Sequence, residues 1–332
     1  MLEPPASADY GRPQTGPDTD VRPALRVLLA APRGFCAGVR RAIDAVRDAL
    51  ALHGAPVFVR RAIVHNLAVV RALEAEGARF VEEIDEVPEG GVVILSAHGV
   101  APAVRTEARA RGLIVYDAVC PLVAKIHREV ERHHASGRRV LLIGHEGHPE
   151  IVGTLGHLPE GAAVLVRSAE DVASLALDDE DEIAYAIQST FSVEEAAAVV
   201  TALEARFERL AGPQGSDICY ATTNRQAAVR EIAGLADAVI VAGEDFSSNA
   251  RRLAEVASHA GCPSVQLVAE AAAIDWTALR AGSTIGLTAA ASTPESSVAG
   301  ILDALRSRYD VEIAQVATTT ETTSFRRVAV PC

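Results

Sequence analysis

Positive charge is scarce in this sequence of 332 residues. Its 31 basic residues face 44 acidic ones, which leaves a formal net charge of −13 at pH 7. Proteins that bind nucleic acid more often carry a basic face, so we expect no nucleic-acid partner. Lysine is rarer still, because Lys125 is the single lysine and every other basic residue is arginine. In such an alanine-rich chain the arginine surplus reflects codon bias, which makes individual arginines weak candidates for phosphate ligands.

Long apolar runs and paired cysteines are also missing. No segment approaches the ~18 apolar residues of a membrane-spanning helix, and the N-terminus is rich in proline instead. We therefore expect a cytoplasmic protein with no membrane partner. Five cysteines without any C-x-x-C pair argue against a secreted disulfide framework and against a compact zinc knuckle. The chain is nonetheless 49% hydrophobic, which is enough to build the cores of two or three domains.

One arrangement recurs after residues 1–24, which we expect to form a disordered tail. A short β-branched or leucine-rich run, a small polar motif and an amphipathic helical stretch follow one another, as at residues 27–31 before PRGFCAGV and 92–95 before SAHG. This order predicts an α/β protein with parallel sheets, whose ligands bind beyond the carboxyl ends of the strands. The expected units cover residues 25–119, 120–216 and 217–310, followed by a C-terminal segment over 311–332.

Three cysteines share one local setting, because Cys36, Cys120 and Cys219 each lie just ahead of a helical stretch. The positive end of a helix dipole favours the thiolate form that binds metal. One cysteine from each of three units suits an iron–sulfur cluster, which four cysteines normally saturate. Three ligands would leave one iron open to a substrate oxygen, which points to catalysis. Cys262 and Cys332 are expected to be non-ligands.

Polar side chains gather at the predicted ends of the strands. Each is ordinary alone, since a serine or asparagine there is more often a helix cap than a ligand. Together they supply neutral or titratable donors that can hold a diphosphate without lysine or arginine. Glu150 is the candidate proton donor, because a carboxyl group shielded from water can keep its proton near neutral pH. The other candidates are His65, His98, His148, Gln188, Ser189, Ser247, Ser248, Asn249 and Ser292.

Eight motifs in this order closely resemble the 4-hydroxy-3-methylbut-2-enyl diphosphate reductase family, the last enzymes of the methylerythritol phosphate route to isoprenoids. They extend from about Arg26 to about Leu305 and read PRGFCAGVRRAI, IVHN, SAHGV, DAVCPLVAKIH, LIGHEGHPEIVGT, DICYATTNRQ, SSN and AAASTPE. The resemblance implies a trefoil of three α/β units with mostly parallel sheets around one [4Fe-4S] cluster per chain. The implied cluster ligands are Cys36, Cys120 and Cys219.

The resemblance also implies the reaction and the residue roles. The C4 hydroxyl of an allylic diphosphate would leave as water, with two electrons and two protons, to give isopentenyl and dimethylallyl diphosphates. Glu150 would feed protons to the leaving oxygen, with Ser189 on the path between them. An external one-electron donor such as ferredoxin or flavodoxin would supply the electrons. The implied substrate-binding residues are His65, His98, His148, Ser189, Ser247, Ser248, Asn249 and Ser292.

Two positions depart from the family pattern. Ser189 stands where the family usually has threonine, so the hydroxyl is kept while the methyl group that would fix its rotamer is missing. Ala290 stands where the family usually has glycine. Neither change removes a chemical group that the reaction uses.

Two alternatives of different function share the three-cysteine pattern. A quinolinate-synthase-like enzyme would use the open iron for a dehydrating condensation and would need no external electrons. A non-catalytic iron–sulfur sensor would need no diphosphate site. The GHEGHPE and SSN motifs favour the reductase over both.

Overall fold

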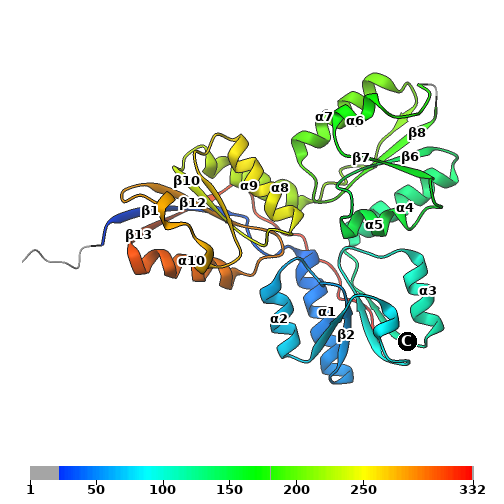
Figure 1. Cartoon of the computed structure of the whole chain (residues 1–332), viewed down its shortest axis with the longest axis horizontal. Helices are drawn as coiled ribbons and strands as arrows, with labels where there is room; N and C mark the ends of the chain where they lie inside the picture. The colour runs from blue at the N-terminus through cyan, green and yellow to red at the C-terminus, as the bar shows by residue number, and fades with distance from the viewer. Residues whose placement is uncertain (1–21, 180, 331–332) are drawn as a thin grey trace, which may run out of the picture.

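The computed structural model describes residues 22–179 and 181–330. This part of the chain forms three lobes around a common centre, each with a parallel sheet and its own helices (Figure 1). The expectation of three α/β units with parallel sheets is confirmed. No helix within these residues has both the length and the apolar character needed to cross a membrane. Most of the expected N-terminal tail and Cys332 lie outside the described residues.

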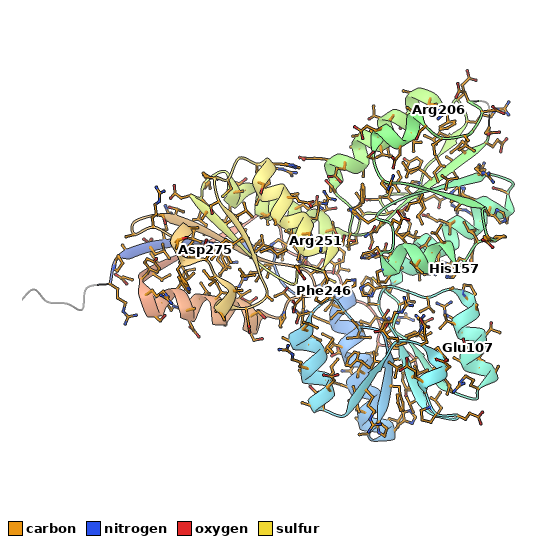
Figure 2. All side chains as sticks on the ribbon, in the orientation of Figure 1. Glu107, His157, Arg206, Phe246, Arg251 and Asp275 are labelled. Atoms are coloured by element: carbon orange, nitrogen blue, oxygen red, sulfur yellow. The ribbon has the colours of Figure 1, made fainter. Side chains whose placement is uncertain are left out.

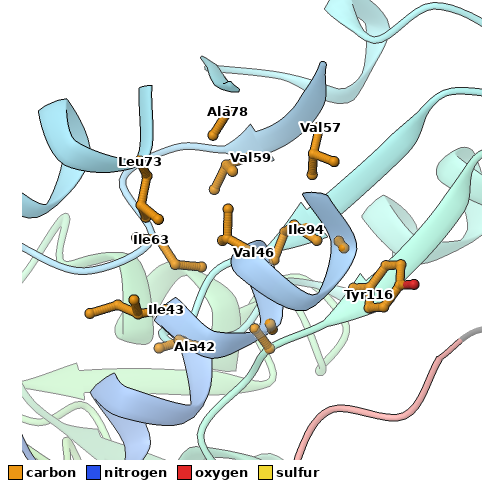
Figure 3. Close-up of a cluster of buried hydrophobic side chains, with 14 of the residues drawn as sticks. Ala42, Ile43, Val46, Val57, Val59, Ile63, Leu73, Ala78, Ile94 and Tyr116 are labelled. Atoms are coloured by element: carbon orange, nitrogen blue, oxygen red, sulfur yellow. The ribbon is translucent and has the colours of Figure 1, made fainter. Parts of the chain in front are cut away.

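The elements of the first lobe are α1 (Ala37–His53), β2 (Val57–Arg60), α2 (Leu67–Ala75), β3 (Ala78–Val81), η1 (Ile84–Glu86), β4 (Val92–Leu95), α3 (Pro102–Ala110) and β5 (Ile114–Asp117). Of these, α1, α2, β2 and α3 run from mid-blue to cyan in Figure 1. The strand order is β3-β2-β4-β5, and β4 is buried at all four positions, as expected of an inner parallel strand. Val39, Ile43 and Val46 recur at helical spacing on the buried face of α1. Figure 3 shows Ile43 and Val46 beside the side chains of β2 and β4.

The second lobe has the same plan. Its elements are α4 (Pro121–Ala135), β6 (Arg139–Ile143), α5 (Pro149–Leu155), β7 (Ala163–Val166), α6 (Ala169–Ala173), β8 (Ile183–Ile187), α7 (Val193–Arg206) and β9 (Leu210–Ala211), with strand order β7-β6-β8-β9. Pro121 is the first helical residue of α4, where its missing N–H costs no hydrogen bond. His157, near the border with the first lobe in Figure 2, donates from Nε2 to the Val100 carbonyl at 3.2 Å and so links the two lobes.

The third lobe combines the first and the last strand of the described residues. Its elements are β1 (Ala24–Ala31), α8 (Tyr220–Ala233), β10 (Ala238–Ala242), α9 (Ser248–His259), β11 (Val265–Val268), η2 (Ala271–Ala273), η3 (Trp276–Ala278), β12 (Thr284–Ala289), α10 (Glu295–Arg308) and β13 (Asp310–Ala317). The strand order is β11-β10-β12-β1-β13. The first strand of the expected unit 25–119 therefore pairs within the third lobe, and the start of the expected C-terminal segment completes the same sheet.

This pairing makes the chain cross between lobes three times on its way from β1 to α8, before the C-terminal segment. It leaves the third lobe between β1 and α1, passes from the first lobe to the second between β5 and α4, and returns between β9 and α8. Cys36, Cys120 and Cys219 each lie in one of these three crossings, directly before the helix that follows. The crossings bring the three cysteines to the centre of the molecule.

Residues 318–330 form neither helix nor strand and return along the first lobe, where Val328 packs against the core beneath α1. The anchor of this segment is Arg225 of α8, whose side chain is only 1% exposed. Its guanidinium donates to the Gly34 carbonyl at 2.6 and 3.0 Å and to Glu321 Oε1 at 2.8 Å. Arg225 therefore ties the first crossing, α8 and the C-terminal segment together.

Removing the Glu321 carboxylate should destabilise the protein because it leaves a buried guanidinium with too few acceptors. We expect Glu321→Ala to lower the free energy of unfolding by about 3 kcal/mol, as measured by urea denaturation. The matched control is Asp303→Ala, which breaks the exposed Arg306–Asp303 pair and should cost about 0.5 kcal/mol or less. Equal losses in the two variants would contradict the anchoring role of Arg225.

Candidate active site

A cavity lies at the centre, where the three lobes meet. It brings together every predicted metal-binding, substrate-binding and proton-donating residue except Gln188, which lies behind the lining. The lining residues with polar or sulfur atoms are Cys36, His65, His98, Cys120, His148, Glu150, Ser189, Thr190, Cys219, Thr222, Ser247, Ser248, Asn249 and Ser292. No arginine or lysine of the described residues lines this cavity.

The three cysteines occupy equivalent positions, because each is the N-cap of the helix it precedes. The Val39 N–H points at the sulfur of Cys36 at 3.4 Å, and the Thr222 N–H points at that of Cys219 at the same distance. The Thr222 hydroxyl lies 3.2 Å from the Cys219 sulfur as well. These donors stabilise negative charge on the sulfurs of Cys36 and Cys219. Cys120 makes no such capping bond, but it also lies at a helix N-terminus, where the helix dipole favours a thiolate.

The cysteines fit a cluster better than a single ion. Among residues 22–179 and 181–330, no three His, Cys, Asp or Glu side chains gather closely enough to hold one metal ion. A cubane cluster binds each thiolate at a different iron, so its ligands need not converge on one point. Gly38 also leaves space for sulfur, since a Cβ there would lie 3.0 Å from the Cys120 Sγ.

Burial sets the charge state of two of the thiols, those of Cys120 and Cys219. It raises the pKa of Cys120 to about 12 and that of Cys219 to about 11, and repulsion from the neighbouring cysteine sulfurs adds to both. The thiols of Cys120 and Cys219, whose ionisation is opposed in this way, become thiolates when a cation binds them. The arrangement is therefore suited to a positively charged iron centre.

Three histidines lie close together in the lining of the cavity. The ring centroids of His65 and His98 lie 4.1 Å apart, and those of His65 and His148 lie 5.5 Å apart. Burial lowers the pKa of His65 to about 4 and that of His148 to about 3, so both imidazoles are neutral at pH 7. His148 caps α5 by accepting the Glu150 N–H at Nδ1, which leaves its Nε2 hydrogen free to donate to a ligand.

Hydroxyl and amide groups complete the donor set. Ser247 caps α9, and Ser292 donates to the His65 carbonyl at 3.0 Å. Asn249 accepts the Ala291 N–H at Oδ1, so its amide nitrogen is oriented away from that contact. No described residue offers a partner to the buried Asn249 Nδ2 or to His65 Nε2. Unpaired buried donors are costly, and an anion in the cavity would satisfy them.

Glu150 and Ser189 form a hydrogen-bonded pair in the lining of the cavity. The Ser189 N–H donates to Glu150 Oε1 at 2.6 Å, and the Ser189 hydroxyl donates to Oε2 at 2.7 Å. Glu150 is only 2% exposed, and burial raises its pKa to about 7 despite these two bonds. Its carboxyl group therefore carries a proton in a large fraction of molecules at neutral pH, as required of a proton donor.

The two departures from the family pattern are accommodated locally. The Ser189 hydroxyl is held by Glu150, so a hydrogen bond fixes the rotamer that a threonine methyl would otherwise restrict. Ala290 is fully buried, and its methyl group faces Gly243, where a Cβ would lie 3.2 Å away.

The sequence does not predict Thr190, Thr222 or Asp217 as functional residues. Threonines near turns and an acid before a cysteine carry no distinctive pattern.

Gln188 has a supporting place behind the lining. Its side-chain oxygen accepts the His145 N–H at 2.9 Å, and its amide nitrogen donates to the Thr190 hydroxyl at 2.7 Å. Cys262 lies apart from the cavity, buried between α9 and β11, with its thiol 3.2 Å from the Ser264 carbonyl.

The fold and the cavity define a three-lobed α/β protein whose centre combines three helix-capping thiols, neutral anion-binding donors and one buried carboxyl group. A family model described as LytB protein matches residues 27–306, and the chain belongs to this family.

Curated relatives and solved structures agree with this assignment. A 4-hydroxy-3-methylbut-2-enyl diphosphate reductase from Methylocella silvestris is 51% identical over 306 residues, covering 92% of this chain and 96% of that protein. The protein of the same name from Paracoccus denitrificans is 52% identical over 307 residues, covering 92% and 97%. The structure of the E-1-hydroxy-2-methyl-but-2-enyl-4-diphosphate reductase from Plasmodium falciparum matches with a TM-score of 0.86 at 34% identity, covering 92% and 96%.

Infrared difference spectroscopy tests the protonation of Glu150. Because burial raises the pKa of this carboxyl group from 4.5 to about 7, it should be protonated below pH 7 and ionise above it. The folded protein then binds more protons than the unfolded chain between these two values, so the stabilising contribution of Glu150 falls as pH rises through this window. Glu150→Gln should remove the protonated carboxyl band that titrates near pH 7. A band that persists in this variant would contradict the assignment.

Proposed function

We infer that this chain is a reductase that converts 4-hydroxy-3-methylbut-2-enyl diphosphate to isopentenyl and dimethylallyl diphosphates. Two electrons and two protons are consumed, the C4–oxygen bond breaks, and one water leaves. The observation that carries this inference is a single cavity lined by three helix-capping thiols, a hydrogen-bonded buried carboxyl group and convergent neutral donors. Relatives at 51 and 52% identity bear the name of this reductase, and neither the quinolinate-synthase-like alternative nor the sensor is favoured.

The cofactor that we assign is one [4Fe-4S] cluster on Cys36, Cys120 and Cys219. When bound, it supplies electrons one at a time and a Lewis-acidic iron with one open position. The protein contributes three thiolate sites at helix N-termini and a buried, apolar surrounding. An external one-electron donor such as ferredoxin or flavodoxin completes the redox balance. Free thiols of this kind fit a reducing compartment, which supports a cytoplasmic location.

Neutral donors hold the diphosphate in this proposal. The Nε2 hydrogen of His148, the free amide of Asn249 and the Ser247 hydroxyl face the same cavity, together with His65, His98 and Ser248. Ser292 also lines the cavity, and its hydroxyl would exchange its bond to the His65 carbonyl for one to the anion. The N-terminus of α9 adds the positive end of a helix dipole. A bound anion favours protonation of nearby imidazoles, so the histidines can gain charge as the substrate binds.

Glu150 delivers the proton to the departing oxygen. Its carboxyl group faces the same cavity as the three thiols, and Ser189 fixes both carboxyl oxygens. The Ser189 hydroxyl bridges Glu150 and the cavity space, so it can relay the proton by donating to the substrate while it accepts from Glu150.

Iron and sulfide analysis of anaerobically purified protein tests the cluster ligands. We expect about four irons per chain in the unaltered protein, with a paramagnetic resonance signal after reduction. Cys36→Ser, Cys120→Ser and Cys219→Ser should each lose most of this iron. Cys262→Ser is the matched control and should retain it, because that thiol contacts only backbone carbonyls. Full iron content after Cys120→Ser, or its loss after Cys262→Ser, would overturn the ligand assignment.

Glu150→Gln and Ser189→Ala test the proton path. The amide keeps the shape of the glutamate but has no transferable proton, and the alanine keeps the Ser189 N–H bond while removing the hydroxyl. Both variants should lower kcat by about 100-fold or more with iron content and KM near normal. Ser189→Thr, which keeps the hydroxyl, is the control and should stay close to the unaltered enzyme. Normal turnover of Ser189→Ala would exclude this hydroxyl from the path.

A further inference from the structure

The single lysine of the chain lies behind the active site. Lys125 is on α4, one and a half helical turns after Cys120, and its side chain is 28% exposed. Every other basic residue in the sequence is arginine. Codon bias explains the thirty arginines but not the one lysine. We therefore looked for a structural reason for lysine at position 125.

The surroundings of Lys125 match the shape of an ammonium group. Its Nζ lies 3.1 Å from Asp217 Oδ1, 3.4 Å from the Ser216 carbonyl and 3.5 Å from Glu129 Oε2. An ammonium group has three donors around one compact centre, whereas a guanidinium presents a flat fork. Three oxygens around one point, two of them hydrogen-bonded and the third ion-paired, therefore select lysine here.

Asp217 connects Lys125 to the segment that carries Ser189 in the active site. Its side chain is completely buried, and its second oxygen, Oδ2, accepts the Ile187 N–H at 3.0 Å. Ile187 ends β8, and Ser189 follows two residues later. The Cys219 N–H donates to the Ser189 carbonyl at 3.1 Å, so the segments 187–189 and 217–219 are joined at both ends.

We propose that Lys125 is a positioning residue: by fixing Asp217, its ammonium group sets segment 187–189 so that both Ser189 donors meet the Glu150 carboxyl group. The Asp217 carboxyl group is held from two sides, by Lys125 on one oxygen and by Ile187 on the other. Without the ammonium group, a buried oxygen loses its donor and the carboxyl group loses its orientation. A displacement of about 1 Å at Ser189 is enough to impair proton delivery.

The role in turnover rests on the proposed reductase function, but the structural link does not. Lys125 touches none of the residues assigned to the diphosphate, so its loss should change kcat rather than KM. A residue that merely stabilised the fold would alter overall stability without selectively exposing the Ile187 and Ser189 amides.

The test compares Lys125→Met and Asp217→Asn with Glu129→Gln as the matched control. The methionine keeps most of the apolar stem, and Glu129 contacts the same ammonium group but has no link to Ile187. Hydrogen–deuterium exchange of the purified protein, read by mass spectrometry over residues 187–189, is the first measurement. Iron content, kcat and KM with 4-hydroxy-3-methylbut-2-enyl diphosphate and a chemically reduced dye as electron donor are the second.

We expect exchange at Ile187 and Ser189 to rise about tenfold or more in Lys125→Met and in Asp217→Asn. We expect kcat to fall about 10- to 100-fold in each variant, with KM and iron content retained. In the double variant Lys125→Met/Asp217→Asn, kcat should fall no further than in either single variant, because both changes break the same contact. Glu129→Gln should match the unaltered protein in all measurements. If Lys125→Met does not fold, Asp217→Asn carries the same expectations.

Unchanged exchange at Ile187 and Ser189, or unchanged kcat in an active enzyme, would overturn the role of Lys125. Loss of iron in parallel with kcat would overturn it as well, because it would place the effect at the cysteines. Absence of turnover in the unaltered, iron-loaded protein would instead overturn the proposed function, while the exchange measurement would still decide whether Lys125 holds segment 187–189.

Discussion

The three crossings between lobes are the constraint on which the rest of the structure depends. Each crossing ends in an extended cysteine that caps a long helix, with ψ angles of 170°, 132° and 151° at Cys36, Cys120 and Cys219. A cap of this kind turns the chain from the sheet of one lobe into the helix of the next. Three helix N-termini then face one centre, and their unpaired N–H groups make it favourable for thiolates and anions. The architecture and the chemistry of the centre thus have the same cause.

Burial gives this centre its charge balance. It lowers the pKa of His65 and His148 and raises the pKa of Glu150, so the imidazoles are neutral and the carboxyl group can hold a proton. Such groups cost less to bury than ions, which explains how so many polar side chains line one cavity. Because water is excluded, a charged ligand that enters the cavity would also shift the pKa of each of these groups strongly. A diphosphate beside the histidines would therefore change the protonation of the site when it binds.

Local sequence patterns predict the elements that carry the site but not how they pair. The runs at residues 27–31 and 92–95 correctly indicate β1 and β4, and the helical stretches expected after Cys36, Cys120 and Cys219 correspond to α1, α4 and α8. Joining β1 to β12 and β13 depends on contacts between distant segments, which hydrophobic periodicity does not encode. The expected first unit therefore begins one strand too early.

The candidate residues were predictable for a different reason. Strands of a parallel sheet present their carboxyl ends on one side, so polar motifs that follow strands meet there even when the lobes are assigned imperfectly. His65, His98 and Glu150 reach the cavity in this way. Lys125 and Asp217 were not predictable, because they lie behind the lining and their relation exists only after α4 has packed beside the 217–219 segment.

No arginine or lysine of residues 22–179 and 181–330 lines the cavity, which suits what the enzyme must discriminate. Substrate and products carry the same diphosphate, so a guanidinium clamp would bind all three alike and would raise affinity without raising kcat. It would also slow the release of the products. In the proposed site, neutral donors at helix ends would hold the anion by their orientation and would leave the differential stabilisation to the groups beside the departing oxygen. The proposed proton path of Glu150 and Ser189 therefore depends on the orientation of its hydrogen bonds more than on net charge. The same holds for the single lysine behind it, which is one cation in a chain with thirty arginines.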